Sequence, residues 1–277
     1  MGLSVNYSLS LPGDPPLDEV EARVRALHAR CGELPLFWMT RVESLSGESL
    51  RRAREKGYVW GASDDVAIHV DGNGHAKLAS DRERPTRYPS YDATTVVSFI
   101  WRPSPGTETG GLGVARSAMS ITVPNAKSPA IEPRTLAIPY ARSPWRGRDS
   151  IKTQYSGQAR FGGIDHFLKS HLTVVAALDA ARDEGFELDV FDDGGYFEHR
   201  DVDALLAELD RWNHLVARVA GGFIDALRGR VDGTIAAPIA ARADFERVEA
   251  GPVREERPAR WSPIVEELLD RTRAVKR

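Results

Sequence analysis

The residue types that could carry out chemistry gather between Lys152 and Arg200. In this stretch a lysine could hold an anionic group, a histidine could move protons, and carboxylates could orient the histidine or bind a divalent ion. We expect these side chains to converge on one candidate site, which comprises Lys152, Gln154, Tyr155, His166, His171, Asp192, Glu198 and Arg200. Such a site would be hydrolytic, with or without a divalent metal, and no other cofactor is expected.

The two histidines are predicted to lie on one helix, five residues apart. At about 100° per residue, His166 and His171 are separated by roughly 140° around the helix axis. They therefore cannot bind one metal ion together, as histidines at positions i and i+4 do. His171 falls on the apolar stripe of the helix. It is either a core histidine with satisfied hydrogen bonds or an acid–base group or metal ligand.

The acidic residues around the turn at 192–195 also have two interpretations. Asp192, Asp193 and Glu198 could be paired carboxylates for metal binding or acid–base catalysis. Alternatively, they are acids that a turn and a helix start favour in any case, through capping and the helix dipole. Asp201 is the expected N-cap of the long helix that follows.

Strands and helices must position these residues, and hydrophobic periodicity predicts where they lie. The expected strands are Leu3–Leu11, Leu36–Leu45, Val66–Val70, Thr94–Trp101, Leu112–Ala118, Thr135–Ile138, Ile151–Tyr155 and Phe186–Val190. The expected helices cover 17–31, 164–184, 201–228 and 261–275. The fold class is therefore α+β: an antiparallel or mixed sheet with helices mainly on one face and strand–helix–strand units at both ends. We expect one domain over 1–250, followed by a linker and an amphipathic helix over 251–277.

Composition narrows the classes of protein that fit. The chain has 277 residues, a formal net charge of −3 and a single cysteine. This charge does not favour nucleic acid, because basic residues cluster only locally, at Arg142, Arg146, Arg148 and Lys152. One cysteine excludes an internal disulfide framework and fits the cytoplasm, and Cys31 is expected to be a small core residue. No apolar run is long enough to predict a membrane span.

Part of the chain resembles a group of uncharacterised bacterial proteins. The resemblance rests on the opening strand and on the pattern Lys152-Thr153-Gln154-Tyr155, Gly162-Gly163, His166-Phe167-Leu168, His171, Asp192-x-Gly194-Gly195-Tyr196-x-Glu198-x-Arg200-Asp201 and Trp212-Asn213. It covers about a third of the chain. It implies that these residues belong together, and it implies no reaction.

Two classes of function fit the sequence. In the first, the chain is a non-catalytic interaction or ligand-binding protein of a bacterial multi-component system. Its partner would be another protein or a second copy, bound through the long helix (201–228) or the C-terminal helix (261–275). In the second, the residues between Lys152 and Arg200 form a hydrolase site.

Overall fold

We describe the fold from a computed structural model. The residues that the structure describes are 3–56, 63–65, 68–70, 76–78, 90–117, 120–123, 134–137, 145–227, 239, 242–251, 254 and 256–274. Within these ranges the chain has the predicted α+β fold, and strand–helix–strand stretches occur near its start and again in its second half.

The main sheet is antiparallel at every strand pair that the structure describes. Its strands are β1 (Ser4–Ser10), β2 (Trp38–Met39), β3 (Glu43–Ser46), β4 (Ser63–Asp65), β7 (Ser90–Arg102), β8 (Gly110–Ser117), β11 (Trp145–Lys152) and β12 (Glu187–Asp192). Their order is β12-β1-β11-β8-β7-β2, and β3 and β4 also pair with β7. Two small hairpins lie apart from this sheet: β5 (Ile68–Val70) with β6 (Ala76–Leu78), and β9 (Ser120–Val123) with β10 (Arg134–Ala137).

β1 is an interior strand, and its sequence sorts the two faces of the sheet. Large apolar residues alternate with serine and asparagine, so Val5, Tyr7 and Leu9 point to one face and are buried. Asn6 and Ser8 point to the other face and are only partly buried. An antiparallel sheet commonly packs one face on the core and leaves the other open in this way.

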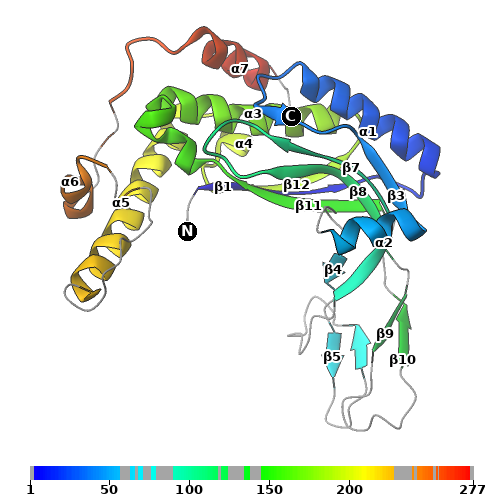
Figure 1. The fold of residues 1–277 in the computed structure, drawn as a ribbon. Coiled ribbons are helices and arrows are strands. Elements are labelled where there is room, and N and C mark those ends of the chain that lie inside the picture. The colour runs from blue at the N-terminus through cyan, green and yellow to red at the C-terminus, as the bar shows by residue number, and fades with distance from the viewer. Residues whose placement is uncertain are drawn as a thin grey trace.

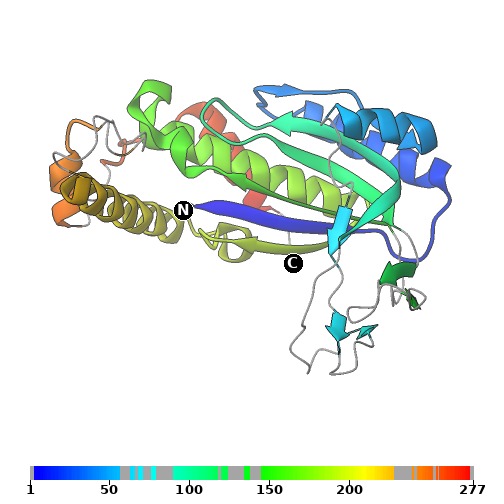
Figure 2. The same cartoon turned by 60° about the horizontal axis from the view of Figure 1, so that its bottom comes forward.

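The helices α1 (Leu17–Gly32) and α3 (Gly163–Asp183) lie on the apolar face of the sheet, and α7 (Pro263–Arg273) packs over α3 (Figures 1 and 2). Every residue of α3 from Ser170 to Ala181 is buried, as expected for a helix covered on all sides. Val265, Leu268 and Leu269 of α7 are buried in the same core. The apolar stripe of the C-terminal helix is therefore covered by its own chain.

Two other helices pack away from this core. α2 (Gly47–Glu55) places Leu50 against Val96 and Ala115 of β7 and β8, which forms a small separate apolar cluster. α5 (Val202–Leu227) begins beside the short helix α4 (Tyr196–His199) and projects beyond the sheet, where α6 (Phe245–Ala250) covers one side of its far half (Figure 1). No helix in the described part of the chain is long and apolar enough to cross a bilayer.

Two predicted strands differ from the observed ones, and polar side chains explain both differences. Leu36–Leu45 is not continuous: it is divided into β2 and β3 because the Thr40 hydroxyl takes a ladder position and accepts a hydrogen bond from the Ile100 amide (3.0 Å). The predicted strand Ile151–Tyr155 ends at Lys152. The Ser156 hydroxyl donates to the Thr153 carbonyl (2.6 Å), and the chain turns into the 3-10 helix η1 (Gln154–Gly157), followed by η2 (Ala159–Phe161).

Candidate functional site

His171 and Asp192 are the predicted site residues that the structure brings into direct contact. His171 Nε2 lies 3.1 Å from Asp192 Oδ2, and its Nδ1 lies 3.1 Å from the Thr153 hydroxyl. Neither the His171 nor the Asp192 side chain has any exposed surface. The rings of Phe167 and Tyr196 pack against the imidazole at centroid distances of 5.8 and 6.4 Å. The pair is sealed in the core.

Asp192 also holds the turn that follows β12. Its Oδ1 accepts from the Gly194 amide (2.8 Å), and its Oδ2 accepts from the Phe197 amide (2.9 Å). Burial alone would raise the pKa of Asp192, but His171 and the two amides outweigh it, so the pKa lies below its ordinary value. The carboxylate therefore joins α3, β12 and α4, and this is a structural role.

Gln154 is a buried clamp between distant segments. Its Oε1 accepts from the Leu3 amide (3.1 Å), and its Nε2 donates to Asn213 Oδ1 on α5 (2.8 Å). With both ends of the amide occupied, the side chain fixes the start of β1 against α5.

Arg200 is paired with a carboxylate that was not predicted to belong to the site. Its two terminal nitrogens each donate to Asp179 at 2.8 Å, and its guanidinium lies over the Phe197 ring at 5.0 Å. Arg200 has a φ of 56°, in the left-handed region that non-glycine residues seldom adopt. Burial raises the pKa of Asp179 more than Arg200 lowers it. This pair ends α4 and anchors it to α3.

The remaining predicted residues lie apart from His171. Lys152 Nζ pairs with Glu108 at 3.0 Å, and His166 Nε2 hydrogen-bonds the Pro105 carbonyl at 3.1 Å. Glu198 is 56% exposed beside His199, and Tyr155 lies in η1. The eight residues thus do not line one pocket. In the described ranges, no group of three or more histidine, cysteine or acidic side chains is arranged to hold a metal ion.

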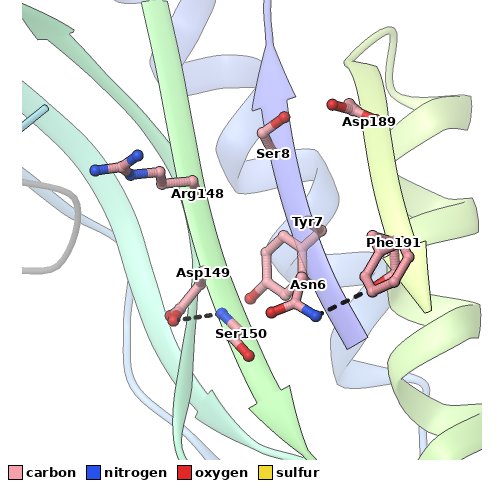
Figure 3. Close-up of a pocket in the computed structure, with 8 residues that line it drawn as sticks. All are labelled: Asn6, Tyr7, Ser8, Arg148, Asp149, Ser150, Asp189 and Phe191. Atoms are coloured by element: carbon pink, nitrogen blue, oxygen red, sulfur yellow. Dashed lines mark hydrogen bonds between the residues drawn. The ribbon is translucent and has the colours of Figure 1, made fainter. Parts of the chain in front are cut away.

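A different candidate site lies on the open face of the sheet, outside the predicted set of eight residues. A hollow of about 540 Å³ spans β11, β1 and β12 (Figure 3). It is lined by Asn6, Tyr7, Ser8, Arg148, Asp149, Ser150, Asp189 and Phe191. We call this surface, together with Arg146 and Glu187 at its border, the open-face site.

Strand register sorts the charges of the open-face site into columns. Ser8 stands between Arg148 and Asp189, and Ser10 stands between Arg146 and Glu187. β11 therefore carries a basic column, β12 an acidic column, and β1 a neutral polar column between them. Figure 3 shows one row across these columns, formed by Arg148, Ser8 and Asp189. Two strand spacings separate the charged columns, about 9–10 Å.

Phe191 is the apolar element of this site. Its residue is 67% exposed on β12, at a position where strand alternation usually places a polar side chain. The Asn6 side chain donates to the Phe191 carbonyl at 3.3 Å, which ties the two residues across the strand pair (Figure 3). A large ring held on a rigid strand is a typical anchor for a binding partner.

Beside the hollow, the strand ladder between β11 and β8 is interrupted. β11 and β8 are in register only at Trp145↔Arg116 and Arg146↔Ala115. Further along, the Asp149 carboxylate accepts from the Gly111 amide (2.6 Å), and the Tyr7 hydroxyl donates to the Gly111 carbonyl (2.7 Å). Burial and the nearby Asp149 charge raise the pKa of Tyr7 well above its ordinary value. Side chains thus replace the backbone pairing between β11 and β8 beside the site.

Parts of the open-face site were visible in the sequence. The alternation in 3–11 predicts its neutral column, and the local basic cluster contains Arg146 and Arg148; Arg142, of the same cluster, lies outside the described residues. The signal that could have completed the site is Phe191, an apolar residue out of phase with Leu188 and Val190. Comparisons of the chain with protein-family models, with curated proteins and with solved structures found no match.

Proposed function

We propose that the protein is a non-catalytic binding protein that holds a partner protein against its open-face site. The observation that carries this proposal is the two-thirds exposed Phe191 ring beside a hollow with ordered columns of charge. In the proposed setting it acts in the bacterial cytoplasm as one member of a multi-component system.

The chemistry of the site specifies the partner. An acidic row on the partner would lie over Arg146 and Arg148, and a basic or hydroxyl-bearing row would lie over Glu187 and Asp189. An apolar side chain would pack on Phe191 and fill the hollow. Charged columns of this kind orient a partner and reject the reversed arrangement, whereas the aromatic anchor supplies most of the affinity.

The rigidity of the surface supports binding without a large rearrangement. β1 and β12 are paired over six residues, from Val5↔Asp192 to Ser10↔Glu187, and β1 and β11 over seven. The backbone of such strands is held in place before the partner arrives, which reduces the entropy lost on binding.

The hydrolase alternative has no comparable support. Its best-placed pair, His171 and Asp192, has no exposed surface through which a substrate could reach it. Gln154 forms hydrogen bonds with Leu3 and Asn213, and Arg200 forms them with Asp179, so both side chains are engaged within the protein.

The test compares partners captured by the wild-type protein with those captured by the double variant R148E/F191A. The matched control is R25E/I264A, which changes an arginine and an apolar residue that are exposed on α1 and α7. We expect at least one protein that binds the wild type and the control and is lost with R148E/F191A. Binding must then be reproduced between the two purified proteins, with affinity lowered at least about a hundredfold in the double variant.

Two results would overturn the proposal. The first is that every captured protein binds R148E/F191A and the wild type equally. The second is that a purified partner binds the charge-reversal variants at Arg148 and at Asp189 as tightly as it binds the wild type. Circular dichroism of the double variant, unchanged from wild type, ensures that lost binding does not reflect unfolding.

A further inference from the structure

The far half of α5 carries an apolar stripe on the side away from α6. Leu215 is 42% exposed and Phe223 is 57% exposed. The side toward α6 is buried and packs Ala217 and Ala220 against Val248. At 100° per residue, the stripe and the buried side point in nearly opposite directions. The stripe consists of Leu215, Gly222, Phe223 and Ala226, which are exposed, and of Val219, which is partly buried.

The spacing of this stripe matches a helix-pairing seam. Positions 215, 219, 222 and 226 follow the alternating steps of four and three residues that coiled-coil helices use at their a and d positions. Gly222 has open space around its Cα, so a second helix can approach closely there. The far half of α5 stands clear of the sheet (Figure 1).

Two charged residues flank the stripe on one side. Arg218 and Asp225 are both exposed and lie seven residues apart, at equivalent positions of the repeat. Seven residues span about 10.5 Å along a helix, too far for the two to pair within one chain. Neither is in an ion pair with any described residue. They can be matched by a second helix that runs the opposite way.

We infer that the far half of α5 is a self-association surface, on which a second copy of this chain packs its own α5 in antiparallel orientation. A twofold axis close to residues 220–221 places Val219 against Gly222 of the second copy, and Leu215 against its Ala226. The same axis brings Arg218 of each copy to Asp225 of the other, so two equivalent ion pairs form across the interface.

This charge pattern selects a second copy over an unrelated helix. A heterologous partner would need its own basic and acidic residues at the matching positions, whereas this chain supplies both in the required order. The stripe extends for only about 17 Å along the helix, so the contact is small and the dimer forms in a concentration-dependent way.

The inference goes beyond the proposed function and involves a different surface. If R148E/F191A loses its partner and yet dimerises like the wild type, the two surfaces are independent. A dimer that fails to form would overturn only the present inference and leave the open-face proposal to its own test.

The experiment is sedimentation equilibrium of the full chain over a wide concentration range. The wild type is expected to dimerise, and L215E and F223E are each expected to weaken the dimer at least about tenfold. R218E and D225R should each weaken it because like charges then meet across the axis. The combined variant R218E/D225R restores opposite charges and should recover most of the affinity. R25E, which reverses an exposed arginine on α1, should have no effect.

Orientation is tested by cross-linking under mild oxidation. A mixture of V219C and G222C chains should form the mixed disulfide in preference to either self-paired product, and the native Cys31 is buried and does not compete. A wild type that stays monomeric at every concentration would overturn the inference. It would also be overturned by a dimer that survives both L215E and F223E, by charge swapping that fails to rescue, or by V219C chains that pair chiefly with themselves. Unchanged circular dichroism of each variant excludes misfolding as the cause.

Discussion

β12 contributes to two polar groups of residues that differ in what they can reach. At its end, Asp192 joins His171 and Thr153 in a sealed group, where every polar atom has a partner within the protein. Three residues earlier, Asp189 lies on the open-face site with serine, asparagine and arginine. The sealed group has the residue types of an active site, and the open group has those of an ordinary surface.

The difference teaches that residue type is a poorer guide to function than access. A histidine and a carboxylate in the core must satisfy each other, because an unpaired buried charge is costly. Their contact is therefore a requirement of burial as much as a sign of chemistry. Exposed Phe191, in contrast, satisfies no requirement of the fold, and this is why it carries the functional proposal.

The largest expected effect comes from breaking the sealed group. D192A leaves His171 and the amides of Gly194 and Phe197 without their buried acceptor. We expect the free energy of unfolding to fall by about 3–5 kcal/mol, measured by urea denaturation. The control is D189A, which removes the other kind of aspartate on this strand, one that lies on the open face, and it should change the free energy of unfolding by less than about 0.5 kcal/mol. Equal losses in the two variants would contradict a structural role for Asp192.

An intermediate effect is expected from acid. Because the folded pKa of Asp192 is lowered, its contribution to stability is present above the unfolded pKa near 4 and is lost as the pH falls through the folded value. Asp179 has the opposite sign: its pKa is raised, so stability falls as the pH rises from its unfolded to its folded value. A comparison of the wild type with D192N separates the contribution of Asp192 to the pH dependence from that of Asp179, because both proteins retain Asp179.

For this comparison we expect the stability difference between wild type and D192N to be full near pH 7 and to shrink in acid below about pH 4. The loss of stability of the wild type in acid is smaller than the loss caused by D192A, because protonation of Asp192 removes its charge and leaves the carboxyl group in place. Urea denaturation at a series of pH values measures it. A difference that stays constant with pH would show that the charge of Asp192 adds nothing to stability.

The smallest effect on stability is expected where the effect on binding is largest. F191A removes a mostly exposed ring and should change the free energy of unfolding by less than about 0.5 kcal/mol. The same substitution at the fully buried ring of Phe167 should cost about 3–5 kcal/mol. If F191A proves as destabilising as F167A in thermal and urea denaturation, Phe191 is a packing residue and the open-face site loses its anchor.

Much of the fold could be predicted because its periodic signals are long. The apolar run in α3 and the β-branched residues of β7 identify their elements without ambiguity. The burial of Cys31 was also predicted, and burial raises the pKa of its thiol to about 12. The hydrogen bonds of Asp201 to the amides of Asp203 and Ala204 confirm the expected cap of α5.

The candidate site could not be predicted equally well, for a physical reason. Whether Gln154 faces a cavity or Asn213 depends on how α5 returns to β1, and no local pattern contains that information. The break between β11 and β8 is equally hidden, because it depends on Asp149 meeting Gly111 across the sheet. The sequence pattern that contains Thr153, His171 and Asp192 did group residues that meet in the structure, because His171 contacts both of the others.

The position of β1 has a consequence for how the chain acquires its structure. This strand comes first along the sequence, but both of its partners, β11 and β12, lie in the second half of the chain. Its backbone ladders on both sides cannot form until those segments exist, so the middle of the sheet closes late, whereas the hairpin of β7 and β8 can form from adjacent residues. Deleting the first ten residues would consequently open a gap inside the sheet rather than trim its edge.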